Sequence, residues 1–171
     1  MIEQHYVLSL LLREMGKSIE DLNQFEGRKY FQKIVYFAQQ APFGLNMGFG
    51  FSLHPHGPYS KELSECAKRI LQQGQECADF CTNNHFRPEV QTGLEQLKTF
   101  AAINTSGLVG LDFLEVAATL HFLWTGPLKH LAVRERKERV IASCNELKPH
   151  FQNSACQVVF TELENWKLIA A

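Results

Sequence analysis

Apolar residues recur at intervals of three and four along most of the chain, which is the spacing of one face of an α-helix. This pattern predicts helices over 2–15, 28–40, 61–73, 89 to about 104, 111–124, 128–147 and 153–169. The run 111–124 is the most continuous apolar stretch, so it predicts a buried central helix with Asp112 at its cap or in its first turn. On 28–40 the pattern leaves Gln32 and Lys33 on the polar face.

A period of two replaces the helical pattern between Phe43 and Leu53, where apolar residues alternate with glycine, asparagine and serine. This alternation predicts a short, irregular edge strand or hairpin arm. The next segment, His54-Pro-His-Gly-Pro-Tyr-Ser, predicts a sharp turn into the following helix, with Ser60 as the N-cap. The polar residues 75–88 predict an irregular connection with a single helical turn through 77–81.

Together these elements predict a mainly α fold, with a winged-helix or helix-turn-helix-like core and a short irregular β-arm. No internal repeat and no long polar linker divides the 171 residues. The pattern therefore predicts a single domain over 1–171, with a core over about 1–125 and a C-terminal helical extension over about 127–171.

The composition is that of a globular chain, with 45% hydrophobic residues and nearly balanced charge. Lys and Arg number 17 against 18 Asp and Glu, so contact with nucleic acid or an anionic membrane would depend on a local patch. No apolar run approaches the ~20 residues that span a bilayer, and the N-terminus lacks the features of a secretion signal. We therefore expect a soluble, cytoplasmic protein without membrane contact. The five cysteines lack Cys-x-x-Cys spacing, which indicates reduced thiols.

Cys77, Cys81 and His85 are spaced four residues apart, so a helix would place them on one side, as metal ligands often are. A histidine or cysteine from 54–66 would have to supply a fourth zinc ligand. Structural zinc sites usually combine two closely spaced ligand pairs, and this segment offers one cluster. The sequence therefore favours free thiols and a surface histidine, and we predict no metal site.

Residues for nucleophilic or phosphate chemistry lack their usual settings. There is no Gly-x-Ser-x-Gly elbow, and the glycine-rich segment 44–50 lacks the Gly-Lys-Ser/Thr ending of a phosphate loop. His54 and His56 beside Tyr59 have two interpretations: an acid/base cluster, or side chains that pin the turn before a helix. The second is favoured, because a helix start leaves backbone groups that need partners. We therefore predict no catalytic residue, no cofactor and no enzymatic activity.

The helix predicted over 128–147 carries a dense group of basic residues: Arg134, Arg136, Lys137 and Arg139. Phosphate binding needs such clustered Lys and Arg. Glu135 and Glu138 interleave with them, however, and Glu135 with Arg139 forms an i,i+4 pair typical of a solvated helix surface. The pattern favours a solvated face and keeps phosphate contact as the alternative.

Three segments carry a resemblance to a known family. They are Tyr30-Phe-Gln-Lys-Ile-Val-Tyr36, His56-Gly-Pro-Tyr-Ser-Lys-Glu-Leu63 and the apolar segment 113–124. Together they resemble the YwgA-like bacterial proteins, and the first two are more distantly similar to the antitoxin-associated Panacea-type domain. The resemblance implies a mainly helical, winged-helix-like domain of the bacterial cytoplasm. For the more distant relatives it implies regulation through protein contacts, including toxin neutralisation, and it implies no catalytic residues.

These observations lead to a non-enzymatic regulatory or protein-interaction module as the expected function, with an antitoxin-like role as one form of it. The residues expected to contact a protein partner are Arg28, Lys29, Lys33, Tyr36, His56, Tyr59 and Lys61. The alternative is a winged-helix DNA-binding transcription regulator, for which the nucleic-acid contacts are Arg134, Arg136, Lys137 and Arg139. A homodimer is compatible with either function.

Overall fold

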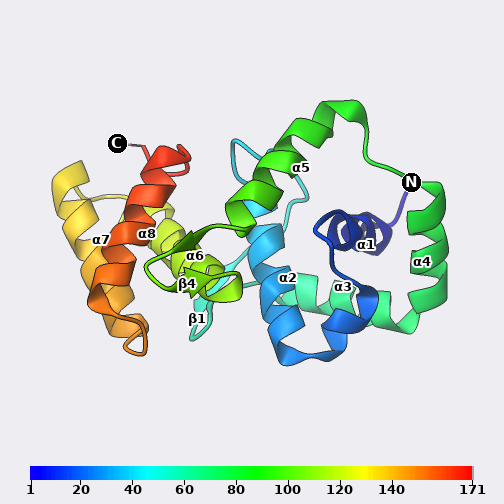
Figure 1. Ribbon diagram of the computed structural model, residues 1–171, viewed down its shortest axis with the longest axis horizontal. Coiled ribbons are helices and arrows are strands. Elements are labelled where there is room, and N and C mark those ends of the chain that lie inside the picture. The colour runs from blue at the N-terminus through cyan, green and yellow to red at the C-terminus, as the bar shows by residue number, and fades with distance from the viewer. Residues whose placement is uncertain (171) are drawn as a thin grey trace. The chain divides into compact units, whose positions relative to one another are not determined.

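The computed structural model describes residues 1–170 and is mainly helical, as the hydrophobic pattern predicts (Figure 1). Its helices are α1 (Gln4–Glu14), α2 (Phe25–Ala38), α3 (Lys61–Gln72), α4 (Gly74–Asn83), α5 (Pro88–Ala101), α6 (Leu111–Thr125), α7 (Val133–Leu147) and α8 (Asn153–Asn165), with the short 3-10 helix η1 (Ile19–Asn23). Its strands are β1 (Ser52–His54), β2 (Gly57–Tyr59), β3 (Asn104–Thr105) and β4 (Leu108–Val109). Strands β1 and β2 form one antiparallel hairpin, and β3 and β4 form another.

The contacts within the chain group into two compact units. The first unit contains residues 1–51 and 60–99, and the second contains residues 52–59 and the chain from Phe100 onward. The C-terminal helices α7 and α8 pack on α6. The sequence analysis assigned α6 to the predicted core and these two helices to a C-terminal extension. Each unit is described by itself below.

In the first unit, α1 packs against α3 and α4, and α2 packs against η1 and α3. The apolar faces of these helices meet in a core that includes Leu8, Leu22, Phe31, Ile34 and Leu63. Helix α2 begins at Phe25, before the predicted start at Arg28. Gly27 therefore lies inside the first turn of α2, where a Cβ would overlap the Asp21 carbonyl oxygen of η1. Glycine is required there by the close approach of the two helices.

Two polar residues of α2 are buried, which corrects the prediction that they face solvent. Gln32 and Lys33 are both inside the first unit. The Gln32 side chain binds both backbone groups of Ser60: its Nε2 donates to the carbonyl oxygen and its Oε1 accepts from the amide, each at 2.9 Å. Ser60 in turn caps α3, because its Oγ accepts from the Leu63 amide at 3.3 Å, as predicted. The buried Gln32 side chain therefore holds the backbone at the start of α3 in place.

One local prediction is wrong, and another is confirmed only in part. Residues 74–83 form a ten-residue helix, α4, where the sequence analysis expected an irregular connection. Its buried face is made by Cys77 and Cys81, which pack as small apolar residues do. The strand or hairpin arm predicted over 43–53 is present only at its end, where Ser52 and Leu53 belong to β1. In the preceding segment Gln39 binds the Phe49 backbone through its side-chain amide, at 2.6 and 3.0 Å.

The second unit is organised around α6, which is buried along almost its whole length, as predicted. Helices α7 and α8, which lie side by side in Figure 1, and strand β2 pack on it. Aromatic rings fill the core, with Phe100 edge-on to Phe113 at 5.3 Å and Trp124 edge-on to Phe160 at 5.5 Å between ring centroids. The core of this unit is thus built on the longest apolar run of the sequence.

The His54-Pro-His-Gly turn is the tip of a β-hairpin, whereas the sequence predicted that it leads directly into a helix. Strands β1 and β2 pair with Ser52 opposite Tyr59 and His54 opposite Gly57, so Pro55 and His56 form a two-residue loop. Gly57 has φ +92°, which a residue with a side chain rarely adopts. The hairpin belongs to the second unit, while Ser60 and α3 belong to the first.

Candidate functional site

The seven predicted partner-binding residues fall in both units. Five lie in the first unit and two in the second. Among the five, Lys33 and Tyr36 are 2% and 4% exposed, and the Tyr36 ring packs edge-on against Phe37 and Phe51. Their side chains fill the core of the first unit, so a partner would not contact them directly. Lys61 is exposed at the first position of α3.

Two further predicted residues of the first unit lie at the start of α2: Arg28 is exposed, and the Lys29 side chain is 15% exposed. Together with Phe25, which was not predicted, they are here called the α2 patch. The Phe25 side chain is 51% exposed, and the Lys29 ammonium lies 5.1 Å from the centre of its ring. Arg28 donates to the carbonyl oxygens of Leu22 at 3.1 Å and Asn23 at 2.9 Å, at the end of η1. These contacts hold an aromatic ring and two cations at fixed positions on the surface.

Phe25 was not among the predicted site residues, because the predicted helix begins at Arg28, after it. A signal for its exposure was present. If α2 is extended back to residue 25, Phe25 lies out of phase with the buried positions Phe31, Ile34 and Val35. The sequence analysis placed the start of the helix three residues late, so this argument could not be applied to Phe25.

In the second unit a buried ionic centre lies behind the β1–β2 hairpin. The Lys148 ammonium, 1% exposed, donates to Glu115 Oε1 and to the Pro55 carbonyl oxygen, both at 2.6 Å. His56 Nδ1 lies 3.8 Å from the same carboxylate oxygen, and the His56 side chain is 53% exposed. We call Glu115, Lys148, His56 and the Pro55 carbonyl the hairpin centre.

The hairpin centre connects three segments that are distant in sequence. Glu115 lies on α6, Lys148 caps the end of α7, and Pro55 and His56 form the hairpin loop. A buried charge requires a partner, so Glu115, the single acid in the apolar segment 113–124, was the signal for such a centre. Tyr59 is half-buried, and its ring lies 4.8 Å from that of His54. Lys148 holds the hairpin loop through the Pro55 carbonyl oxygen.

The basic residues of α7 divide into two kinds. Arg136 donates to the carbonyl oxygens of Lys129 and Leu131 at 2.6–3.1 Å and lies over the Trp124 ring at 4.7 Å. Lys137 pairs with Glu164 of α8 at 3.2 Å. These two side chains stabilise the packing of the second unit. Arg134 is almost fully exposed, 3.7 Å from Glu138, and Arg139 is exposed as well.

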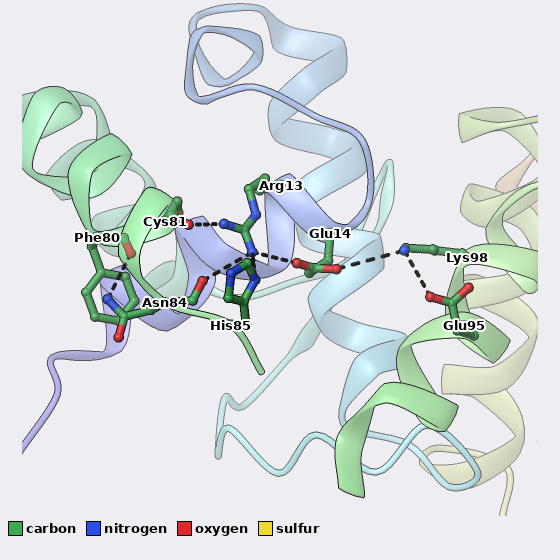
Figure 2. A network of polar contacts seen from close by, with 8 residues as sticks. All are labelled: Arg13, Glu14, Phe80, Cys81, Asn84, His85, Glu95 and Lys98. Carbon is green, nitrogen blue, oxygen red and sulfur yellow. Dashed lines mark hydrogen bonds and ion pairs between the residues drawn. The ribbon is translucent and has the colours of Figure 1, made fainter. Parts of the chain in front are cut away.

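A polar network joins α1 to the end of α4 in the first unit, as Figure 2 shows. The Arg13 guanidinium donates to the carbonyl oxygens of Cys81 and of Asn84, the latter at 3.3 Å. It also lies 2.7 Å from Glu14 Oε1 and 3.2 Å from His85 Nδ1. Arg13 thereby satisfies carbonyl groups that the end of a helix leaves without partners.

This network gives Cys77, Cys81 and His85, whose spacing suggested a metal site, a different explanation. Cys77 and Cys81 face the core, while His85 directs Nδ1 at a guanidinium, so that a cation already occupies that side of the ring. Within residues 1–170, no group of three or more His, Cys, Asp or Glu side chains is arranged to hold a metal ion.

Comparisons with protein families, with curated proteins and with solved structures found no match to this chain. Among the helices of residues 1–170, none is long and apolar enough to cross a membrane. Fold and site together define a mainly helical protein with two small antiparallel hairpins, a buried ionic centre behind one hairpin and an aromatic, cationic patch at the start of α2.

Proposed function

We propose that this protein is a non-enzymatic regulatory module of the bacterial cytoplasm that binds a protein partner through the α2 patch. The observation that carries the proposal is the half-exposed ring of Phe25, with the Lys29 ammonium 5.1 Å from its centre and the exposed Arg28 three residues along the same helix. Aromatic and arginine side chains are the residues that most often dominate binding at protein interfaces. Toxin neutralisation, which the family resemblance implies, is one form of this function.

The support for the proposal includes the rigidity of the patch. Arg28 is held by two backbone carbonyl groups, and Lys29 lies 3.3 Å from the Glu26 carboxylate as well as over the Phe25 ring. A surface whose side chains are already ordered loses less entropy when a partner binds. Its two cations and one ring fit a partner segment that carries apolar and acidic side chains.

Site-specific photo-crosslinking tests the proposal. A photoreactive phenylalanine analogue replaces Phe25 in one sample and Leu147 in a matched control, because Leu147 is also an exposed apolar residue and lies in the second unit. Irradiation in cells of the source organism should crosslink position 25, but not position 147, to one defined protein. A crosslink to a second copy of the chain would also support the proposal. Arg28→Glu should reduce that crosslink. Equal crosslinking at both positions, or capture of nucleic acid alone, would contradict the proposal.

The alternative is a DNA-binding regulator with a winged-helix-like core, and the exposure of Arg134 and Arg139 on α7 favours it. When DNA binding is electrostatic, the logarithm of the binding constant falls linearly with the logarithm of the salt concentration, with a slope of about −0.9 per phosphate contact. Arg134→Ala with Arg139→Ala should therefore make the slope shallower by about 2. Lys68→Ala, an exposed cation of α3, serves as the control. Undetectable binding to genomic fragments at low salt excludes this alternative.

A further inference from the structure

Two thiols face each other between α7 and α8 in the second unit. Cys144 Sγ and Cys156 Sγ lie 3.2 Å apart and share a hydrogen bond, and the residues are 0% and 1% exposed. Both are free thiols. Cys144 lies in the last turns of α7, and Cys156 lies in the first turn of α8, so the two helices meet through these sulfur atoms.

The geometry is close to that of a disulfide. A disulfide bond is about 2.05 Å long, so the sulfur atoms need to approach by roughly 1.2 Å to form one. The helices that carry them already pack against each other. We propose that Cys144 and Cys156 form a reversible redox pair, whose disulfide links the end of α7 to the start of α8.

Nearby charge favours the reaction. The ammonium of Lys148 lies one helical turn after Cys144 and is held in place by Glu115. The hydrogen bond between the two thiols lowers the pKa of the Cys156 thiol, and Lys148 acts in the same direction against the effect of burial. The same hydrogen bond, with burial, raises the pKa of Cys144. Cys156 is therefore the thiol that attacks an oxidant, and Cys144 is the thiol that then attacks the oxidised Cys156.

The oxidant that the proposal requires is a peroxide. The Cys156 thiolate attacks one oxygen of hydrogen peroxide, the O–O bond breaks, and the departing hydroxide takes up a proton to leave as water. Cys144 then attacks the resulting sulfenic acid, the S–O bond breaks, and a second water leaves with the Cys144 proton. Two thiols and one peroxide thus give one disulfide and two waters, and a thiol reductant reverses the change.

The pair is joined to the hairpin centre. The Lys148 amide donates to the Cys144 carbonyl oxygen at 2.9 Å, and the Lys148 ammonium holds the Pro55 carbonyl oxygen at 2.6 Å. A disulfide that fixes Cys144 to α8 also restrains the residue that pins the hairpin loop. Oxidation should therefore make the β1–β2 hairpin open less often.

The test uses the full chain. The reduced protein is exposed to hydrogen peroxide at neutral pH, unfolded in urea with N-ethylmaleimide, and mapped by peptide mass. We expect a crosslinked peptide that contains Cys144 and Cys156, with three of the five thiols still alkylated, and loss of the crosslink on addition of dithiothreitol. Because both sulfur atoms are buried, half-exposed Cys66 should react with maleimide faster in the folded protein.

The control variant Cys66→Ser should form the same crosslink, whereas Cys156→Ser should leave Cys144 as a maleimide adduct. If the Cys156 variant fails to fold, the peptide map of the unmodified sequence still decides. Full alkylation of both Cys144 and Cys156 after peroxide treatment, or a mixture of crosslinks among all five cysteines, would overturn the proposal. Hydrogen exchange tests the coupling: residues 52–59 should exchange more slowly in the oxidised protein, and equal exchange in both forms would refute a link to the hairpin.

Discussion

Acid should destabilise the protein through one buried histidine, His121 on α6. Its side chain is inside the second unit, 3% exposed, and makes a hydrogen bond with the backbone of Leu168. Burial disfavours the charged imidazolium and lowers the pKa of His121 from 6.5 to about 4, although the Leu168 bond acts in the opposite direction. The folded protein therefore holds this ring neutral at a pH where the unfolded chain would protonate it.

The direction and size of the effect follow from the two pKa values. Because the pKa of His121 is lower in the folded state, its contribution to stability is complete above pH 6.5 and is lost as the pH falls toward 4. The difference of 6.5 − 4 = 2.5 units corresponds to about 3 kcal/mol, at ~1.4 kcal/mol per unit. Most of that loss should be present by a pH of about 4.5.

Urea unfolding from pH 7.5 down to 4.5 measures this contribution. His121→Gln removes the titrating group and keeps a donor for the Leu168 backbone, so its stability should fall less steeply with pH than that of the parent protein. Comparing each protein with its own value at neutral pH cancels any uniform cost of the substitution, and subtracting one pH profile from the other cancels the titration of the groups that both proteins share. The matched control is His130→Gln, an exposed histidine near the end of α6, which should leave the pH profile unchanged. Parallel profiles for the parent and the His121 variant would refute the reasoning.

Three further substitutions test the packing, each by the free energy of urea unfolding. Lys148→Met removes the cation that pairs with buried Glu115 and should cost about 3–5 kcal/mol, whereas the double variant with Glu115→Gln should recover part of that loss. Equal costs for the single and the double variant would contradict the ion pair. Gly93→Ala on α5 places a Cβ against the Phe43 carbonyl oxygen and should destabilise by about 1–3 kcal/mol, while Gly74→Ala, where the space is open, should not. Ser60→Ala removes the cap of α3 and should cost about 1 kcal/mol, and no change would show that the cap is dispensable.

The parts of the fold that were predictable are those encoded by neighbouring residues. The apolar run 111–124 corresponds to α6, within one residue at its end, because a helix buried along its length needs no partner to be recognised. Ser60 was identified as a cap because the N-cap interaction spans only three residues. Helix α4 was missed because its buried face is made by Cys77 and Cys81, which read as candidate ligands rather than core.

The parts that were not predictable depend on pairings between distant residues. Lys148 and Glu115 are separated by 33 positions, and nothing local to either indicates the other. Gln32 looked like a surface residue because its polarity fits the exposed face, and its burial depends on backbone groups 28 residues later. The candidate surface could be located on α2 from Arg28 and Lys29. Phe25, its aromatic member, required the exact start of the helix.

The burial of these polar side chains also explains the most distinctive motif of the sequence. The segment from Pro55 to Ser60 leaves the second unit and enters the first, and each unit holds its own end of it. Within the second unit, Lys148 binds the Pro55 carbonyl; within the first, Gln32 binds both backbone groups of Ser60. A segment with prolines and a glycine has few backbone donors with which to bind itself, so buried side chains supply the partners. The prolines and the glycine of this motif therefore fit a hairpin turn whose backbone groups are bound by buried side chains.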